Sequence, residues 1–311
     1  MYYLEKQTNP KNIWDILAQI TVEEAAESFL SQLKVHTKRS YRTALKNIFA
    51  IWEKKGIFNR KASLQTLAQC NLETLLDLIA QNITSSESTK QNRCAAFVSF
   101  TKFLCRSTRR VIHPALPKQG ANPTFQKIRK KSATGSFTLE EWGRFIQALR
   151  KISYRDYLIA KAIFQGAKRC SEVLEARIES INWEEKAIRY IQLKSHLIED
   201  STYIHYSQEF MNELREYLDG RTCGYIFITR TGCPLTQPHL YRSFAYASVL
   251  AKLKKRVHPH MLRASAITSL FKMGYHSDQI MQVSGHANPT MVIYYDKTPI
   301  EDNLTKEIKL C

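Results

Sequence analysis

Acidic residues are absent from a long central stretch of the sequence. None occurs between Glu87 and Glu140. The basic residues of the same stretch include Lys90, Arg93, Lys102, Arg106, Arg109, Arg110, Lys118, Lys127, Arg129, Lys130 and Lys131. The chain of 311 residues carries a net charge of +18, with a pI near 9.6. A cationic excess of this size indicates a polyanionic partner, nucleic acid first and an anionic membrane surface second.

Long apolar runs and paired cysteines are missing as well. No segment is apolar for long enough to span a bilayer, and residues 1–17 lack the basic start and apolar core of a signal peptide. We therefore expect a cytoplasmic protein. The seven cysteines are widely spaced and form no C-x-x-C pair, which argues against a disulfide framework and against a zinc site. They are interpreted as ordinary reduced cysteines, and no cofactor or metal is expected.

The chain holds enough apolar sequence for two domains. Hydrophobic residues make up 44% of it and Gly and Pro are few, which is typical of a globular protein. Residues 1–115 show helical spacing of apolar residues and are interpreted as a helical DNA-binding domain. Its predicted helices begin at Thr21, at Thr37 or Ser40, near Leu72 and after Ser88. The basic side chains on its second helix either contact phosphates or form a solvated face.

A basic linker, residues 116–136, contains Pro, Gly and Asn without an apolar period. Because it lies in the acid-free stretch, we favour contact with nucleic acid over a merely solvated tether. Residues 137–311 are predicted to be mainly helical. Strand-like runs at 186–193 and 201–207 form a predicted hairpin, and a third candidate strand covers 225–229. The expected fold is mainly α with a small antiparallel β-sheet, in two domains.

Residues suited to phosphate chemistry gather near the C-terminal end. His260 and Arg263 are three apart, so they share a face of a helix, and His286 and the adjacent Tyr294 and Tyr295 follow. A cation, imidazoles and a phenol are what phosphate chemistry with a protein nucleophile needs. Taken singly, each of them is explained better by packing or solvation, so the interpretation depends on partners elsewhere in the chain.

Three residues earlier in the second domain are candidate partners. Arg169 and Glu172 are three apart at a predicted helix start, so the carboxylate can hold the guanidinium. The alternative is an ordinary surface ion pair. Lys194 ends the first strand of the predicted hairpin. It is either simply exposed or a proton donor on a flexible loop.

In order and spacing these residues resemble the tyrosine recombinases, the phage integrase family. AKRCSEVLEA resembles the family's first-arginine motif, HPHMLRASAITSLFKMG its His-x-Leu-Arg box, and VSGHANPTMVIYY its Leu-Gly-His box. In the family the nucleophile follows the last histidine by nine residues, which selects Tyr295 over Tyr294. The resemblance covers most of residues 137–300, and the N-terminal part matches the family's core-binding domain in layout only. The short basic chain is also similar to the plasmid-borne integrases of the chlamydiae.

The resemblance implies a site-specific DNA recombinase or integrase that works through a covalent 3′-phosphotyrosine, without metal or ATP. The catalytic residues it implies are Arg169, Lys194, His260, Arg263, His286 and Tyr295, with Glu172 orienting the first arginine. In these roles the arginines bind the phosphate, His260 acts as acid or base, His286 donates to the phosphate and Lys194 protonates the leaving 5′ oxygen. The implied partner is double-stranded DNA. The chain is expected to be a monomer when free and to form a homo-tetramer on the DNA. The C-terminal tail is either an element passed between protomers or a frayed terminus.

The sequence departs from the family pattern at four positions. Ala167 and Lys168 replace the usual glycine and apolar residue, and Ala264 stands where many members have a second histidine. Asp296 places a negative charge beside the predicted nucleophile, which is expected to slow attack. The main alternative is a catalytically weak, recombinase-like DNA-binding protein that regulates plasmid replication or copy number. A type IB topoisomerase and an RNA-binding protein are further alternatives.

Overall fold

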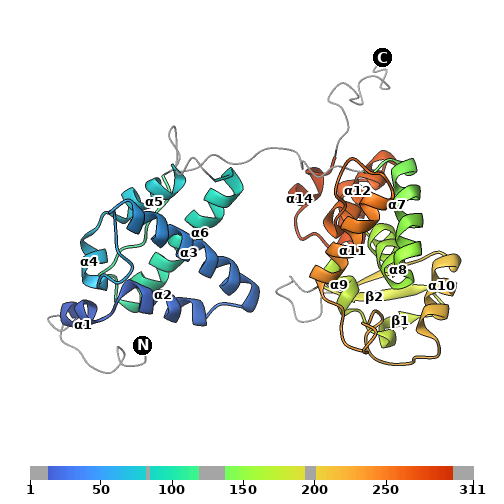
Figure 1. Ribbon diagram of the computed structural model, residues 1–311, viewed down its shortest axis with the longest axis horizontal. Coiled ribbons are helices and arrows are strands. Elements are labelled where there is room, and N and C mark those ends of the chain that lie inside the picture. The colour runs from blue at the N-terminus through green and yellow to red at the C-terminus, as the bar shows by residue number, and fades with distance from the viewer. Residues whose placement is uncertain (1–12, 82–84, 119–136, 193–200, 297–311) are drawn as a thin grey trace, which may run out of the picture. The chain divides into compact units, whose positions relative to one another are not determined.

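The protein forms two compact units, residues 1–129 and 130–311 (Figure 1). The structure, a computed structural model, describes residues 13–81, 85–118, 137–192 and 201–296. Lys194 and the C-terminal tail lie outside the described residues, as does most of the predicted linker. The division between the units falls within the sequence 116–136 that the composition marks as a linker.

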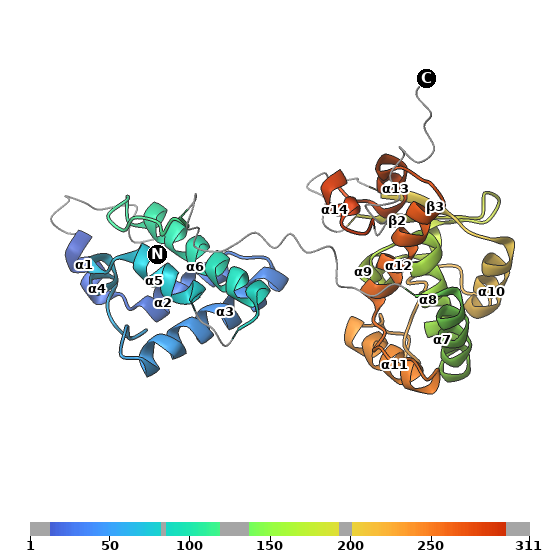
Figure 2. The same ribbon diagram turned by 90° about the horizontal axis from the view of Figure 1, so that it is seen from above.

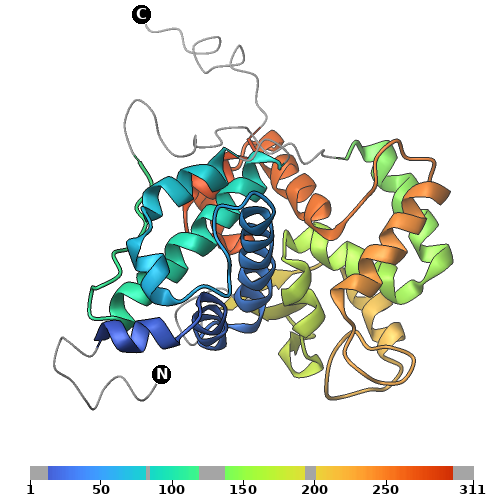
Figure 3. The ribbon, with the colours of Figure 1, turned by 60° about the vertical axis from the view of Figure 1, so that its left-hand side comes forward.

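Unit 1 is a bundle of helices (Figures 1 and 3). Its helices are α1 (Ile13–Gln19), α2 (Val22–Ser31), α3 (Val35–Lys54), α4 (Leu64–Gln69), α5 (Leu72–Ala80) and α6 (Glu87–Ser107). The predicted start of α2 is confirmed, because Thr21 and Glu24 form a reciprocal capping box. Apolar faces of the helices meet in an aromatic core, in which the rings of Trp52 and Phe97 pack edge to face with centroids 5.3 Å apart.

Three details of the first unit differ from the prediction. α6 begins at Glu87, with Ser86 as its cap, and not after Ser88. α3 begins at Val35 and not at Thr37 or Ser40, and its cap residue Lys34 makes no side-chain capping bond. Because no capping side chain marks this start, a prediction based on capping residues places the start of α3 too late in the sequence. The six residues of α4 were not predicted, since fewer than two turns give too little periodicity to recognise.

Unit 2 combines helices with a small sheet, which confirms the predicted fold class. Its elements are α7 (Leu139–Ile152), α8 (Tyr154–Gly166), α9 (Cys170–Glu175), the 3₁₀ helix η3 (Ile178–Ser180), β1 (Ile181–Asn182), β2 (Ala187–Ile191), β3 (Ser201–His205), α10 (Gln208–Leu218), α11 (Gln237–Leu250), α12 (Pro259–Lys272), α13 (Ser277–Ser284) and α14 (Pro289–Ile293). The capping box predicted for Thr138 and Glu141 at the start of α7 is present. In the described parts of the chain, no helix is long and apolar enough to cross a membrane.

The sheet has the order β1-β2-β3, and both pairings are antiparallel. The predicted hairpin is confirmed, with Tyr190 of β2 opposite Thr202 of β3. The two-residue strand β1 was not predicted. The candidate strand at 225–229 is wrong, because these residues form only isolated bridges. Its buried Ile226 and Phe227 give it a strand-like composition through burial alone.

α8 is the central helix of unit 2 and is buried along most of its length. It packs against α7, α9, α10 and α12 (Figure 2). α8 ends at Ala167, whose φ of 47° lies in the left-handed region where glycine is favoured. This turn sends the chain directly into α9, so that Arg169 becomes its cap residue.

Candidate active site

Three helices near the C-terminal end and the turns that follow them hold four of the predicted site residues, His260, Arg263, His286 and Tyr295. Figure 2 shows α12, α13 and α14 with α9 on the same side of unit 2. α12 begins with Pro259, whose fixed φ suits the first position of a helix. α13 ends at Gly285, whose left-handed φ of 69° turns the chain toward His286. Asn288 then caps α14, which leads to Tyr295.

The two adjacent tyrosines have different surroundings. Tyr295 is 8% exposed, and its hydroxyl lies 3.3 Å from Nε2 of His260. Its backbone carbonyl accepts a hydrogen bond of 3.2 Å from the Thr268 hydroxyl. Tyr294 is 37% exposed. Only the second tyrosine is therefore held by α12 beside a histidine that can take its proton.

The phenol of Tyr295 is protonated at neutral pH. Burial raises its pKa above the ordinary value, while the charges of Arg263 and Arg169 act in the opposite direction. An attack by this oxygen on phosphorus must therefore transfer the proton to a base. His260 is in position to accept it.

Arg263 is a buried arginine with an unsatisfied donor. It is 2% exposed, and its Nη2 lies 3.0 Å from Nε2 of His286. Its Nη1 has no hydrogen-bond acceptor among the described residues, since Oε2 of Glu172 is 3.9 Å away. Burial lowers the pKa of Arg263 to about 10. A buried donor without an acceptor costs about 1–3 kcal/mol, which an oxygen of a bound phosphate would offset.

Arg169 is fixed by a buried carboxylate. Its Nη1 donates to Oε1 of Glu172 at 2.7 Å, and its backbone N–H donates to Oε2 at 3.0 Å. Its guanidinium also lies 3.4 and 3.5 Å from the carbonyl oxygen of Gly285. The predicted contact between this arginine and Glu172 is confirmed. The alternative of a surface pair is wrong, because Glu172 is 2% exposed.

His286 is a buried neutral imidazole. Burial first, and then the charges of Arg263 and Arg169, lower its pKa to about 3. Because an arginine only donates, Nε2 of His286 accepts from Arg263, and Nδ1 therefore donates to the Ser284 hydroxyl at 2.8 Å. Donation from Nε2 to a phosphate requires the other tautomer or a protonated ring.

The structure brings most of the predicted residues into one cluster. These are Arg169, Glu172, His260, Arg263, His286 and Tyr295. Lys194 lies outside the described residues. The sequence did not point to Thr268 or Ser284, although a polar residue among the buried residues of α12 is a usable signal for the first. Across the described ranges, no three His, Cys, Asp or Glu side chains gather as a metal site would require.

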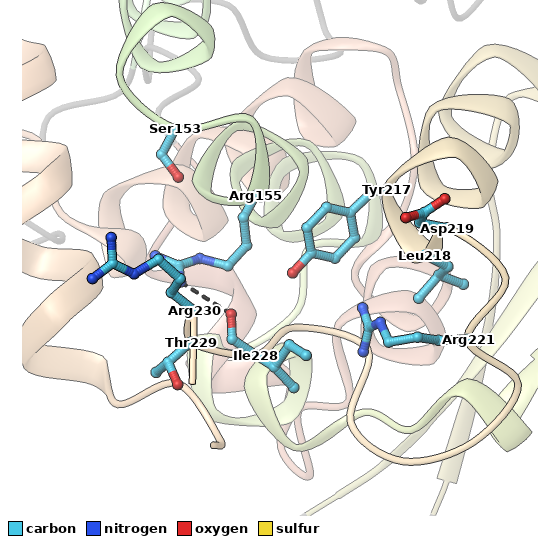
Figure 4. A pocket seen from close by; sticks show the side chains of 9 residues that line it. All are labelled: Ser153, Arg155, Tyr217, Leu218, Asp219, Arg221, Ile228, Thr229 and Arg230. Carbon is cyan, nitrogen blue, oxygen red and sulfur yellow. Dashed lines mark hydrogen bonds between the residues drawn. The ribbon is translucent and has the colours of Figure 1, made fainter. Parts of the chain in front are cut away.

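A shallow pocket of about 460 Å³ lies elsewhere in unit 2 (Figure 4). Its Arg155 donates to Asp156 at 2.8 Å and to the carbonyl of Ile228 at 3.0 Å. Its Arg221 donates to two backbone carbonyls of the same loop region. These arginines hold the loop that precedes α11, and none of the predicted site residues lines this pocket.

The fold matches solved structures of DNA recombinases. The Tn1549 transposon integrase in complex with transposon right end DNA is 14% identical, with a TM-score of 0.69 over 93% of this chain and 98% of that chain. The XerH site-specific recombinase bound to its difH substrate is 16% identical, with a TM-score of 0.67 over 96% of this chain and 90% of that chain. The chain therefore shares its fold with these DNA recombinases.

Sequence comparison identifies the family. The model of the phage integrase family matches residues 136–299. The virulence plasmid integrase pGP8-D of Chlamydia trachomatis serovar L2 is 34% identical over 305 residues, 96% of this chain and 91% of that protein. The virulence plasmid integrase pGP7-D of Chlamydia muridarum is 34% identical over 270 residues, 85% of this chain and 87% of that protein. The chain belongs to the phage integrase family, and the predicted similarity to chlamydial plasmid integrases is confirmed.

Proposed function

We propose that the chain is a site-specific recombinase that cleaves and rejoins double-stranded DNA through Tyr295. The observation that carries this proposal is the placement of one hydroxyl. The buried Tyr295 oxygen lies 3.3 Å from a histidine nitrogen, in the same cluster as two arginines. A nucleophile, a base and a cationic clamp are what phosphodiester exchange requires.

Cleavage proceeds as an in-line exchange of phosphorus–oxygen bonds. Arg169 and Arg263 bind the non-bridging oxygens, and one such donor contributes about 3–4 kcal/mol to the transition state. The Tyr295 oxygen attacks phosphorus and passes its proton to His260. The bond to the 5′ oxygen breaks, and Lys194 supplies the proton that this leaving oxygen takes up. Because the phosphodiester energy is kept in the 3′-phosphotyrosine, a second DNA end reverses the step without ATP or metal.

His286 has two roles in this proposal. As a neutral ring it accepts from Nη2 of Arg263 and so fixes the plane of the buried guanidinium. When the phosphate arrives and takes over as acceptor for Arg263, the imidazole changes tautomer and donates to a phosphate oxygen. The Ser284 hydroxyl supports either state because a hydroxyl can donate or accept.

In this proposal, the N-terminal domain of residues 1–115 and the basic linker 116–136 supply further DNA contacts. A groove of about 370 Å³ between α3 and α6 supports it, and Arg39 and Arg93 are among its lining residues. Guanidinium groups in such a groove suit backbone phosphates. We further propose that the chain is monomeric when free, forms a homo-tetramer on two duplexes, and acts in the cytoplasm.

Covalent capture tests the proposed reaction directly. A pool of duplexes with a randomised segment, each carrying one nick that traps the cleaved product, is incubated with protein and resolved under denaturing conditions. Wild type and Tyr294→Phe are expected to form a protein–DNA adduct, and Tyr295→Phe none. A chelator should leave the yield unchanged. Sequencing of the captured DNA then identifies the target site.

Other results would point to other functions. An adduct in Tyr295→Phe would refute the assigned nucleophile. Specific binding without any wild-type adduct would indicate the DNA-binding regulator of plasmid replication. Relaxation of supercoiled DNA without strand exchange would indicate a topoisomerase.

A further inference from the structure

A third cation lies buried beneath the two arginines. Lys168, at the junction of α8 and α9, is 0% exposed. Charged lysines are almost never fully buried unless they are paired, because moving an ammonium out of water is costly. Of the proposed catalytic groups, Arg169 and His260 are at least partly exposed, whereas this side chain is fully enclosed. Its ammonium is engaged by protein groups, which favours a role other than direct contact with DNA.

The ammonium of Lys168 contacts groups on four separate elements. It donates to the Thr202 hydroxyl on β3 and, at 3.3 Å, to the Val283 carbonyl on α13. It lies 3.6 Å from Oε2 of Glu172 on α9. It also lies over the ring of Tyr190 on β2, 5.8 Å from its centroid. One cation thus ties the hairpin, the helix before His286 and the carboxylate that holds the first arginine.

The contact with Glu172 links Lys168 to both arginines. One carboxylate oxygen of Glu172 accepts from Arg169 at 2.7 Å, and the other is 3.9 Å from Arg263 and 3.6 Å from the ammonium. The single carboxylate is thus surrounded by cations on different elements. Without the ammonium, the second oxygen would lose the nearer of its two side-chain cations and keep the backbone N–H of Arg169.

We propose that Lys168 is a positioning residue of the cleavage reaction, whose buried ammonium fixes Glu172 and, through it, the two phosphate-binding arginines. The inference rests on the recombinase function proposed above. Where the family pattern has an apolar residue, this chain has a cation that contacts the carboxylate holding Arg169. It acts only while protonated, because a neutral amine no longer attracts the carboxylate.

The protonation of Lys168 falls in an accessible range of pH. Burial lowers its pKa to about 8, with the carboxylate of Glu172 opposing the shift. The ionisable groups that face it are Glu172 and Arg169 on α9, Arg263 on α12, Tyr190 on β2 and His286 after α13. Of these, Arg263 has its pKa near 10, His286 near 3, and Tyr190 well above its ordinary value. A fall in activity as pH rises through about 8 is therefore expected to report the deprotonation of Lys168.

The test measures the rate of adduct formation against pH on the captured nicked duplex. The wild-type rate is expected to fall as pH rises through about 8. Lys168→Met, which keeps the length of the side chain, is expected to be slower by about 10- to 100-fold at pH 7, as for other groups that orient a reacting side chain. Its rate should lack the alkaline fall, and its affinity for DNA should stay within about twofold of wild type.

Lys161→Met is the matched control. Lys161 is also a buried lysine of unit 2, but its ion pair is with Glu213, away from the cluster. Its replacement is expected to lower stability while leaving the rate and the pH profile unchanged. If Lys168→Met fails to fold, Thr202→Val serves instead. Loss of the hydroxyl acceptor should lower the pKa of the ammonium and move the alkaline fall to lower pH.

The outcomes separate this inference from the proposed function. A wild type without adduct at any pH overturns both. A wild-type adduct whose alkaline fall persists in Lys168→Met, or is unmoved in Thr202→Val, overturns the positioning role alone. Loss of the fall in Lys161→Met would also overturn it, because any buried lysine would then have the same effect.

Discussion

At the scale of single residues, burial decides which groups can react. Tyr295 and Tyr294 are identical in chemistry and adjacent in sequence, yet only Tyr295 is enclosed and has its hydroxyl next to His260. Enclosure keeps the phenol protonated until a phosphate binds, so the hydroxyl does not react with other groups. The same enclosure strengthens the field of Arg263 at the attacking oxygen, since few water molecules screen it.

The neutral state of His286 predicts a dependence of stability on pH. Its folded pKa of about 3 lies below the ordinary value of 6.5, so protonation favours the unfolded chain. Its stabilisation is complete above pH 6.5 and is lost as pH falls toward 3. The loss is at most about 1.4 kcal/mol for each pH unit. Urea unfolding between pH 7 and 4.5 should show this loss in wild type and a smaller one in His286→Gln.

His239→Gln provides the control for this comparison. His239 is exposed on α11, so its replacement should leave the pH dependence of wild type unchanged. Equal pH dependence in wild type and His286→Gln would show that His286 is not held neutral by the fold.

Motif spacing along the sequence predicted most residues of the cluster, but not the residues that support them. The resemblance to the family selected Tyr295, because Tyr295 follows His286 by nine residues and Tyr294 by eight. Thr268 and Ser284 could not be chosen in this way. Each acts through one hydrogen bond across the fold, and a single hydroxyl leaves no periodic signal. Lys168 was noticed as a departure, but its contacts exist only once β3 and α13 are folded against it.

At the scale of elements, the turn after α13 connects backbone geometry to the site. Gly285 has a left-handed φ, and its carbonyl faces the guanidinium of Arg169. A Cβ at this position would lie 3.0 Å from the side chain of Gln192. The glycine therefore both allows the left-handed end of α13 and leaves room for Gln192, which follows β2.

Gly285→Ala is expected to impair cleavage more than stability. The left-handed conformation costs an alanine about 1–2 kcal/mol, and relief of the contact with Gln192 displaces the carbonyl that faces Arg169. Gly274→Ala is the matched control, because Gly274 also has a positive φ but open space around its Cβ. Both variants should lose similar stability in thermal unfolding. Only the first should form adduct more slowly, and equal rates would contradict the assigned role of the turn.

Element prediction succeeded where a signal is local. The capping boxes at Thr21 and Thr138 each lie within four residues, so they could be recognised without knowledge of the fold. The 225–229 segment misled because a buried loop and a strand have the same composition. Strand pairing depends on a partner from elsewhere in the chain, and no local pattern reports whether one is present.

At the scale of the whole molecule, the two units have separate cores. The cluster around Trp52 and Phe97 belongs to unit 1, and the cluster around Phe145 and Phe244 belongs to unit 2. All described residues of the proposed active site come from unit 2. Chemistry and most of the acid-free basic stretch are thus assigned to different parts of the chain.

We expect residues 130–311 to fold alone and to retain cleavage with weakened binding. Calorimetry of this fragment should give one cooperative transition close to one seen in the full chain. Its affinity for the captured duplex should be lower and less sensitive to salt, since fewer phosphate contacts release fewer counterions. Equal salt dependence in the fragment and the full chain would show that unit 1 and the linker do not contact the phosphates.

The contact between Tyr295 and α12 has a consequence for mixed assemblies. The tyrosine returns to the helix that bears His260 and Arg263 in its own polypeptide. In the proposed reaction, each copy therefore cleaves with its own tyrosine. It can donate this tyrosine to the active site of a neighbour only if α14 leaves its own α12. In an assembly of active and tyrosine-less copies, the number of opened strands would therefore count the active copies.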